Sequence, residues 1–359
     1  MKEFLKRKNI EISVKRYGID ALGAMAQGLF ASLLIGTILN TLGKQLGIAF
    51  LTTAGGYASS CSGAAMAAAI GYALQAPPLV LFSLVTVGYA ANALGSTTLS
   101  GGSGAGGPLA VLFIAIIAAE CGKAVSKETR VDILVTPIVT VLVGVGLSAW
   151  WAPAIGTAAS AVGGVIKWAT VQQPFLMGIV VSVVIGMALT LPISSAAICA
   201  ALGLTGLAGG AAVAGCCAQM VGFAFMSFKE NKWGGLVSQG IGTSMLQMGN
   251  IVRNPWIWLP PTLTAAITGP IATCLFRLEM NDPASAVASG MGTCGLVGQI
   301  GVYAGWAADV ASGAKAAVTA FDWLGLVLIS LVLPAVLAPL IALPFRKAGL
   351  IKDGDMTLS

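Results

Sequence analysis

Apolar runs long enough to cross a lipid bilayer recur along this chain, separated by short polar breaks. A membrane helix needs about 20 predominantly apolar residues, and we predict about ten spans, at 20–43, 48–73, 78–95, 108–122, 131–151, 174–191, 193–207, 209–227, 257–277 and 322–345. Only 9% of the residues are charged, against about 25% in a soluble domain. The runs are continuous rather than alternating, which argues against a transmembrane β-barrel. The expected fold class is an all-α polytopic membrane protein.

Two further segments, 235–252 and 284–306, are apolar but interrupted by glycine and polar residues. The most unusual stretch runs from Gly234 to Pro270 and combines glycines, prolines and amide side chains. In lipid, broken backbone with amide side chains survives only where protein buries it or where it lines a wet cavity. A transport pathway is the commonest reason for such a segment.

Basic residues give the expected orientation. Residues 1–18 predict a basic amphipathic helix on an anionic leaflet, which places the N-terminus in the cytoplasm. The basic residues that should share that side are Lys123, Lys127, Arg130, Lys229, Lys232, Arg346, Lys347 and Lys352. The cytoplasmic tail, 346–359, reaches that side only if 235–252 and 284–306 both return to the side they entered from.

We therefore predict two re-entrant hairpins around the 257–277 span, although a change of parity elsewhere would satisfy the same rule. The transport domain then covers 19–345. The run 152–173 contains Pro153 and a Gly-Gly pair, and we expect it to form an interfacial connection.

Several classes of function are excluded by what the sequence lacks. It contains no histidine, which removes histidine-based acid–base chemistry, phosphohistidine relays within the chain and most transition-metal sites. It has no phosphate-binding P-loop and no catalytic GxSxG or HExxH motif. We expect no catalytic residue, no metal, no cofactor and no nucleic-acid partner, because the basic residues form no face interleaved with aromatics.

The interrupted segments supply the candidate binding residues. Amide side chains both donate and accept hydrogen bonds, which suits a hydroxyl-rich ligand such as a sugar, and Trp256 and Trp258 could stack on its face. Alternatively, the amides cap broken helix ends and the tryptophans belong to the interfacial belt. The predicted substrate-binding residues are Gln239, Gln247, Asn250, Arg253, Asn254, Glu279 and Gln299.

The charged and isolated members of this set have alternatives of their own. Arg253 and Glu279 either face the pathway or snorkel at helix ends. Gln299, the deepest amide of the segment 281–299, either faces the ligand or makes a hydrogen bond between helices.

The same residues resemble a known family. The runs NPWIWLPPT (254–262), ITGPI (267–271) and GMGTCGLVGQ (290–299), with PISSAA (192–197) and GIGTSMLQ (240–247), are similar to the stand-alone membrane subunits of phosphotransferase-system enzyme IIC, in the branch that includes PfoR-type regulators. The resemblance implies a homodimeric membrane protein that carries a sugar-like substrate by moving one domain against another. It also implies separate IIA and IIB proteins for phosphorylation, because this chain contains neither domain.

Three hypotheses follow. The first is a bacterial plasma-membrane permease subunit for a small polar, sugar-like molecule. The second is a ligand-sensing membrane regulator whose basic N-terminal segment is its output surface. The third is a transporter of an organic-anion or lipid-like substrate without phosphorylation, in which Arg253 matters more than the amides.

Overall fold

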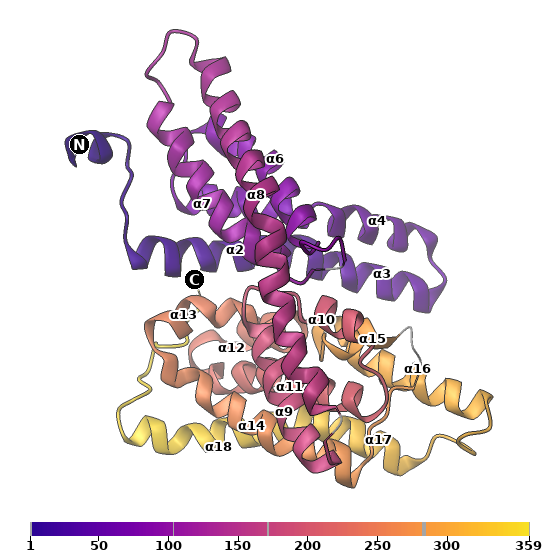
Figure 1. Ribbon diagram of the computed structural model, residues 1–359. Helices are drawn as coiled ribbons and strands as arrows, with labels where there is room; N and C mark the ends of the chain where they lie inside the picture. Colours follow the sequence, from indigo (N-terminus) through magenta and orange to yellow (C-terminus); the bar gives the residue numbers. More distant parts are fainter. Residues whose placement is uncertain (1, 103, 171, 282–284, 359) are drawn as a thin grey trace. The chain divides into compact units, whose positions relative to one another are not determined.

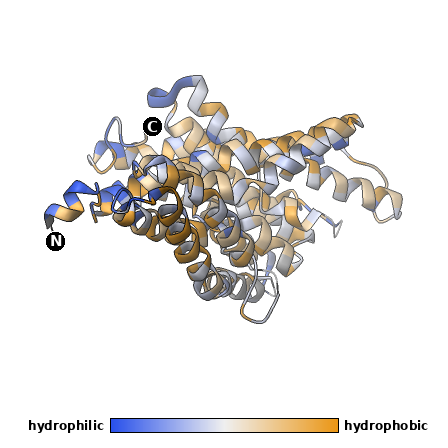
Figure 2. Ribbon diagram, turned by 90° about the horizontal axis from the view of Figure 1, so that it is seen from above, coloured by the Kyte–Doolittle hydropathy of each residue, from blue (hydrophilic) through white to orange (hydrophobic). Residues whose placement is uncertain are grey.

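The computed structural model describes residues 2–102, 104–170, 172–281 and 285–358, and the chain divides into two compact units, Met1–Ser160 and Ala161–Ser359 (Figure 1). The described residues form helices and no β-strand, apart from one isolated bridge between Gly206 and Met280. The prediction of an all-α polytopic membrane protein is confirmed. Figure 2 shows mainly hydrophobic or neutral helices, with hydrophilic residues at the N-terminal segment, near the C-terminus and at some helix ends.

The first unit is built from helices that pack through small residues. Its elements are α1 (Lys2–Arg7), η1 (Arg16–Asp20), α2 (Ala21–Leu29), η2 (Phe30–Leu34), α3 (Ile35–Leu46), α4 (Ala49–Ser60), α5 (Ser62–Ala73), α6 (Pro78–Gly95), α7 (Gly107–Val125) and the start of α8 (Asp132–Ala169). A Cβ on Gly63 would lie 2.3 Å from the carbonyl oxygen of Gly88. The close approach of α5 and α6 therefore requires glycine at this position.

The helix expected over residues 1–18 is shorter. Only Lys2–Arg7 forms α1, because Asn9 adopts a left-handed conformation with φ of 54° and ends it. A continuous helix then runs from Arg16 to Lys44.

The second unit contains a core of long helices and several broken ones. Its elements are α9 (Pro174–Thr190), α10 (Ser195–Leu202), α11 (Gly206–Met226), α12 (Phe228–Val237), η3 (Ser238–Gly242), η4 (Ser244–Gln247), α13 (Met248–Arg253), η5 (Pro255–Trp258), α14 (Leu259–Pro270), η6 (Ile271–Leu275), α15 (Ala286–Ser289), η8 (Cys294–Leu296), α16 (Val297–Ala311), α17 (Ala320–Val327), η9 (Leu328–Val332) and α18 (Leu333–Lys347). Almost every residue of α11 is buried, so this helix is the centre of the unit.

Six helices of the described chain are long and apolar enough to span a membrane: Arg16–Lys44, Pro78–Gly95, Gly107–Val125, Asp132–Ala161, Gly206–Met226 and Ala320–Lys347. The other predicted spans are shorter or interrupted. The run 48–73 divides at Cys61 into α4 and α5, and 257–277 consists of the consecutive helical pieces η5, α14 and η6, which end at Leu275.

Two expectations from sequence are corrected. The run 193–207 holds only the eight residues of α10, about 12 Å of helix, because Gly203 takes a left-handed C-cap and Thr205 is extended. The run 152–173 is not an interfacial connection, because α8 continues to Ala169. Pro153 lies inside this helix, where it removes a single backbone hydrogen bond.

The direction of the helices in the second unit follows from their contacts. Ser182 of α9 lies against Gly215 of α11, and Gly186 lies against Gln219, so α9 and α11 run parallel. The residues between them, 191–205, therefore carry the chain back across the unit even though only the eight residues of α10 are helical. Contacts of α9 with α14 run in the opposite order, from Ser182 with Ala265 to Gly178 with Gly269, so α14 is antiparallel.

Two helical hairpins enter this unit from opposite ends. Hairpin 1 (residues 228–253) begins and ends beside the C-terminal segment, since Asn231 donates to the carbonyl of Met356 and Asn250 to that of Thr357. Hairpin 2 (residues 285–311) begins and ends at the other end of α14, where Asn281 donates to Asp309 at 2.9 Å. The two segments predicted to return around the 257–277 span therefore form hairpins, and their re-entry into the membrane stays a prediction.

The tips of the hairpins meet beside the middle of α11. Ser244 of hairpin 1 shares a hydrogen bond of 2.8 Å with Thr190. In hairpin 2, Gly292 lies against Cys216, and Thr293 donates to the sulfur of Met220. The breaks themselves, η3 and η8, are in contact.

Candidate functional site

The amides of hairpin 1 form one buried chain of hydrogen bonds. Gln239 and Gln247 are fully buried and Asn250 is nearly so. Asn250 donates to the side-chain oxygen of Gln247 at 2.8 Å, Gln247 donates to Gln239 at 2.8 Å, and Gln239 donates to Ser227 at 2.9 Å. Each amide thus satisfies the next, as buried polar groups require.

The remaining donors of this chain bind the C-terminal segment, residues 349–358, which we call the tail segment. Gln247 donates to the carbonyl of Met356 and Asn250 to that of Thr357, both at 2.9 Å. Asn254 donates to the carbonyl of Leu350 at 2.8 Å and to the carboxylate of Asp355 at 2.7 Å. Four predicted binding residues are therefore brought together, but the chain itself occupies their donors.

The other three predicted residues lie apart from this cluster. Arg253 is exposed at the end of α13. Gln299 lies beside α11, where it donates to the sulfur of Cys217 at 3.3 Å while its own oxygen is buried without a hydrogen-bond partner. Glu279 lies at the opposite end of α14 from hairpin 1.

The two tryptophans also separate. Trp256 is 46% exposed and packs against Phe345. Trp258 donates to the oxygen of Gln219 at 3.1 Å, and the amide of Gln219 donates to Thr262 at 3.1 Å. This second polar network joins α11 to the start of α14, so Trp258 and Gln219 have hydrogen-bonding roles between helices.

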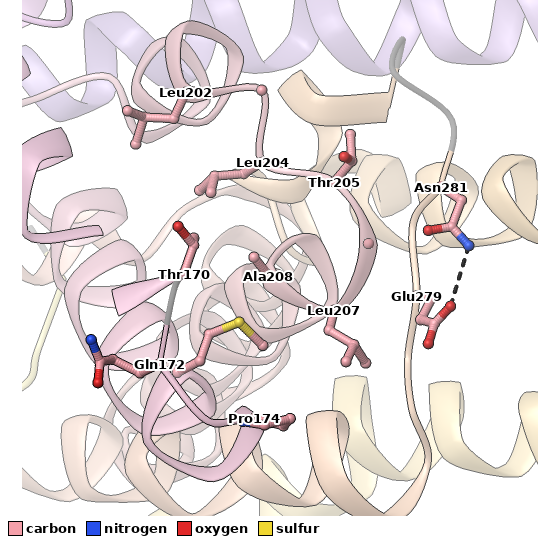
Figure 3. Close-up of a pocket in the computed structure, with 13 residues that line it drawn as sticks. Thr170, Gln172, Pro174, Leu202, Leu204, Thr205, Leu207, Ala208, Glu279 and Asn281 are labelled. Atoms are coloured by element: carbon pink, nitrogen blue, oxygen red, sulfur yellow. Dashed lines mark hydrogen bonds between the residues drawn. The ribbon is translucent and has the colours of Figure 1, made fainter. Parts of the chain in front are cut away.

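A pocket of about 550 Å³ opens at the end of the unit that is opposite to the tail segment. Figure 3 shows its lining, which comes from the start of α9, the connection before α11 and the segment 279–281: Thr170, Gln172, Pro174, Met177, Leu202, Gly203, Leu204, Thr205, Gly206, Leu207, Ala208, Glu279 and Asn281. Residues from all three segments therefore line one space.

The backbone of this pocket is fixed by a short pairing. Gly206 donates to the carbonyl of Met280 at 2.8 Å, and Met280 donates back at 3.1 Å. Gly206 has φ of 59°, a left-handed conformation that glycine adopts without strain. This pairing holds segment 279–281 against the start of α11.

Glu279 is the charged group of the pocket. Its carboxylate accepts from Asn281 at 3.2 Å and lies 3.5 Å from the guanidinium of Arg277. Its side chain is 30% exposed. Asn281 also donates to Asp309 at 2.9 Å, so one amide orients two carboxylates and leaves the Glu279 oxygens able to accept from a ligand hydroxyl.

A family model described as "Phosphotransferase system, EIIC" matches residues 19–358 of the chain. The chain belongs to this family. No curated protein and no solved structure matches it. The family indicates a sugar-type permease component of the phosphotransferase system, which is embedded in a membrane and works with IIA and IIB proteins.

In this EIIC protein, sequence reasoning found Glu279 but missed its neighbours in the pocket. Gln172, Thr205 and Asn281 line it together with Glu279. Thr205 could have been found from the sequence. It stands between Gly203 and Gly206, and two glycines so close together do not favour a helix that crosses the membrane. Gln172 and Asn281 each belong to a pair of polar residues near the end of an apolar run, where amides are common.

Proposed function

We propose that this EIIC protein is a permease that binds a small polyhydroxyl molecule in the pocket around Glu279 and passes it between the two hairpin tips. The observation that carries this proposal is the meeting of hairpins 1 and 2, from opposite ends of the unit, against α11. Membrane transporters place substrate near such discontinuous helices, because their free backbone groups are available to the ligand.

The pocket favours a neutral, hydroxyl-rich substrate. Its volume of about 550 Å³ lies within the range of roughly 300–1,000 Å³ typical of small-molecule sites. It offers the carboxylate of Glu279, two amides and hydroxyl groups, and hydroxyl ligands pair with all of these. An anionic substrate fits less well, because Glu279 would repel it and Arg253 lies at the other end of the unit.

The two ends of the unit differ in a way that supports alternating access. One end carries the pocket, while the amides at the other end are bound to the tail segment. A substrate that leaves past hairpin 1 would meet Gln239, Gln247, Asn250 and Asn254 only after the tail segment had released them. The seven residues predicted from sequence would then act at successive stages, with Glu279 first and the amides last.

Counterflow in proteoliposomes tests the proposal without any phosphorylating partner. A panel of labelled hexoses, polyols and disaccharides should yield saturable uptake of at least one compound. Glu279→Gln keeps the shape but weakens a charge-assisted hydrogen bond of about 1.5–3 kcal/mol, so it should lower the affinity about 10- to 150-fold. The control is Lys347→Gln, which removes an exposed charge in the last turn of α18, outside the pocket.

Two outcomes would replace the proposal. Saturable binding without counterflow would favour the ligand-sensing regulator. Uptake of an organic anion would favour a transporter of organic-anion or lipid-like substrates, if Arg253→Gln abolishes this uptake and Glu279→Gln leaves it intact. The homodimer, the cytoplasmic location of both termini and the coupling to phosphorylation remain predictions.

A further inference from the structure

We propose that the first unit contains a separate binding site for a phosphate-bearing anion, formed by the N-terminal segment and the connections after α5 and α7. A cavity of about 380 Å³ lies there, lined by Arg7, Lys8, Asn9, Gln75, Pro77, Lys123, Ser126, Lys127 and Glu128. Four cationic side chains thus line it with the carboxylate of Glu128, and one of them, Lys123, also lies 2.9 Å from the carboxylate of Glu120. Such an excess of positive charge in a confined space attracts anions.

Part of this charge is held in place by buried contacts. The side chain of Lys123 is 1% exposed, and its ammonium donates to the carbonyls of Asn9 at 2.6 Å and Leu74 at 3.1 Å. Lys8 is 9% exposed and donates to the carbonyl of Ser126. The cavity therefore has a fixed wall of two ammonium groups rather than a set of free surface lysines.

Glu128 occupies the position that we assign to the anion. One of its carboxylate oxygens lies 2.7 Å from the guanidinium of Arg7 and 2.5 Å from the ammonium of Lys8. A carboxylate oxygen between two cations is a chemical stand-in for a phosphate oxygen. Arg7 is 63% exposed and Lys127 is also exposed, so both can turn to a second anion.

The backbone around the cavity is strained. Asn9, Gln75 and Lys127 have φ values of 54°, 54° and 60°, and they are three of the six non-glycine residues with positive φ in the described chain. This conformation is costly for long side chains and collects at functional sites. Here it places all three side chains around one cavity.

The surroundings favour a lipid headgroup as the source of the phosphate. Arg7 and Lys8 lie over the ring of Phe4, while Ile12 and Val14 are 79% and 76% exposed. Apolar side chains beside basic ones are typical of segments that lie in the membrane interface. With these side chains among the acyl chains, the cavity would lie at headgroup depth.

Binding of short-chain lipids to the full chain in detergent tests this site. The probes are dihexanoyl phosphatidylglycerol, dihexanoyl phosphatidylcholine and inorganic phosphate. Each basic residue near an anionic surface contributes about fivefold to binding, so Arg7→Gln with Lys127→Gln should weaken the phosphatidylglycerol interaction about 25-fold. The matched control is Lys15→Gln, which removes an exposed charge of the same segment outside the cavity.

Glu128→Gln should change the binding of anionic lipid in the opposite direction. It removes the competing carboxylate, so affinity for the anionic lipid should rise, a gain that misfolding cannot produce. Binding of phosphatidylglycerol alone would identify a lipid site, and equal binding of inorganic phosphate would identify a site for free phosphate. The proposal is overturned if phosphatidylcholine binds as well as phosphatidylglycerol, or if Glu128→Gln weakens binding.

Discussion

Replacing Gln247 by leucine should loosen the tail segment from hairpin 1. Gln247 is fully buried and takes part in three hydrogen bonds, with Gln239, Asn250 and the carbonyl of Met356. Leucine has nearly the same volume but makes none of them. Met356 still accepts from Asn231, and Asn250 still donates to Thr357, but the side-chain oxygen of Gln239 is left buried without a partner.

The loss of stability can be estimated from these hydrogen bonds. The three lost hydrogen bonds cost about 1 kcal/mol each, and the acceptor left without a partner costs about 1–3 kcal/mol. Burial of leucine offsets part of this, so the free energy of unfolding should fall by roughly 2–4 kcal/mol. Only one of the lost bonds reaches the tail segment directly, and Asn250 also loses the partner that orients it. Release of the tail segment should therefore become about 5- to 30-fold more favourable, equivalent to about 1–2 kcal/mol.

Thiol labelling measures this release. Met356 is fully buried, so Met356→Cys should react with a hydrophilic maleimide only when the tail segment leaves. The exposed Cys61 and Cys274 are first changed to alanine. The control is Gln173→Leu, an exposed glutamine at the start of α9. If Gln247→Leu labels no faster than the parent and melts at the same temperature, the amide chain does not hold the tail segment.

Three further predictions concern charge, packing and topology. Lys229 donates to Asp353 at 2.5 Å, which lowers the pKa of Asp353 below its ordinary 3.8. This ion pair therefore persists as pH falls and is lost only below about pH 4, where the melting temperature should fall further in the parent than in Asp353→Asn. Gly215→Ala places a Cβ 1.9 Å from the carbonyl oxygen of Ser182 and should cost about 3 kcal/mol or more of stability, whereas Gly23→Ala, with open space around it, should leave the melting temperature unchanged or higher. Cysteines at Lys127 and Asp353 should both be protected from an impermeant reagent in intact cells and react after permeabilisation, and labelling of either in intact cells would contradict the charge-based orientation.

The two hairpins were predictable because the physical rule behind them is strict. Glycines, prolines and amides inside apolar runs cannot form ordinary membrane helices, and each amide needs a partner. The positive-inside rule then favoured the return of both segments to the side they entered from. The same reasoning could not predict that α10 is short. The run 193–207 is apolar along its whole length, and its composition does not show that the helix ends at Gly203.

The partners of the amides could not be predicted, and this changes how the candidate site is understood. The sequence places Gln247 and Met356 more than 100 positions apart, and the tail segment, with one lysine and two aspartates, has the composition of a solvated end. Its contribution is made mostly by backbone carbonyls, which carry no sequence signature. The amides therefore satisfy the rule that buried polar groups are paired without any ligand, so their presence alone does not identify a substrate site. The pocket of Glu279 differs because its carboxylate oxygens keep room for further donors, and this difference is why we place the first contact with substrate there.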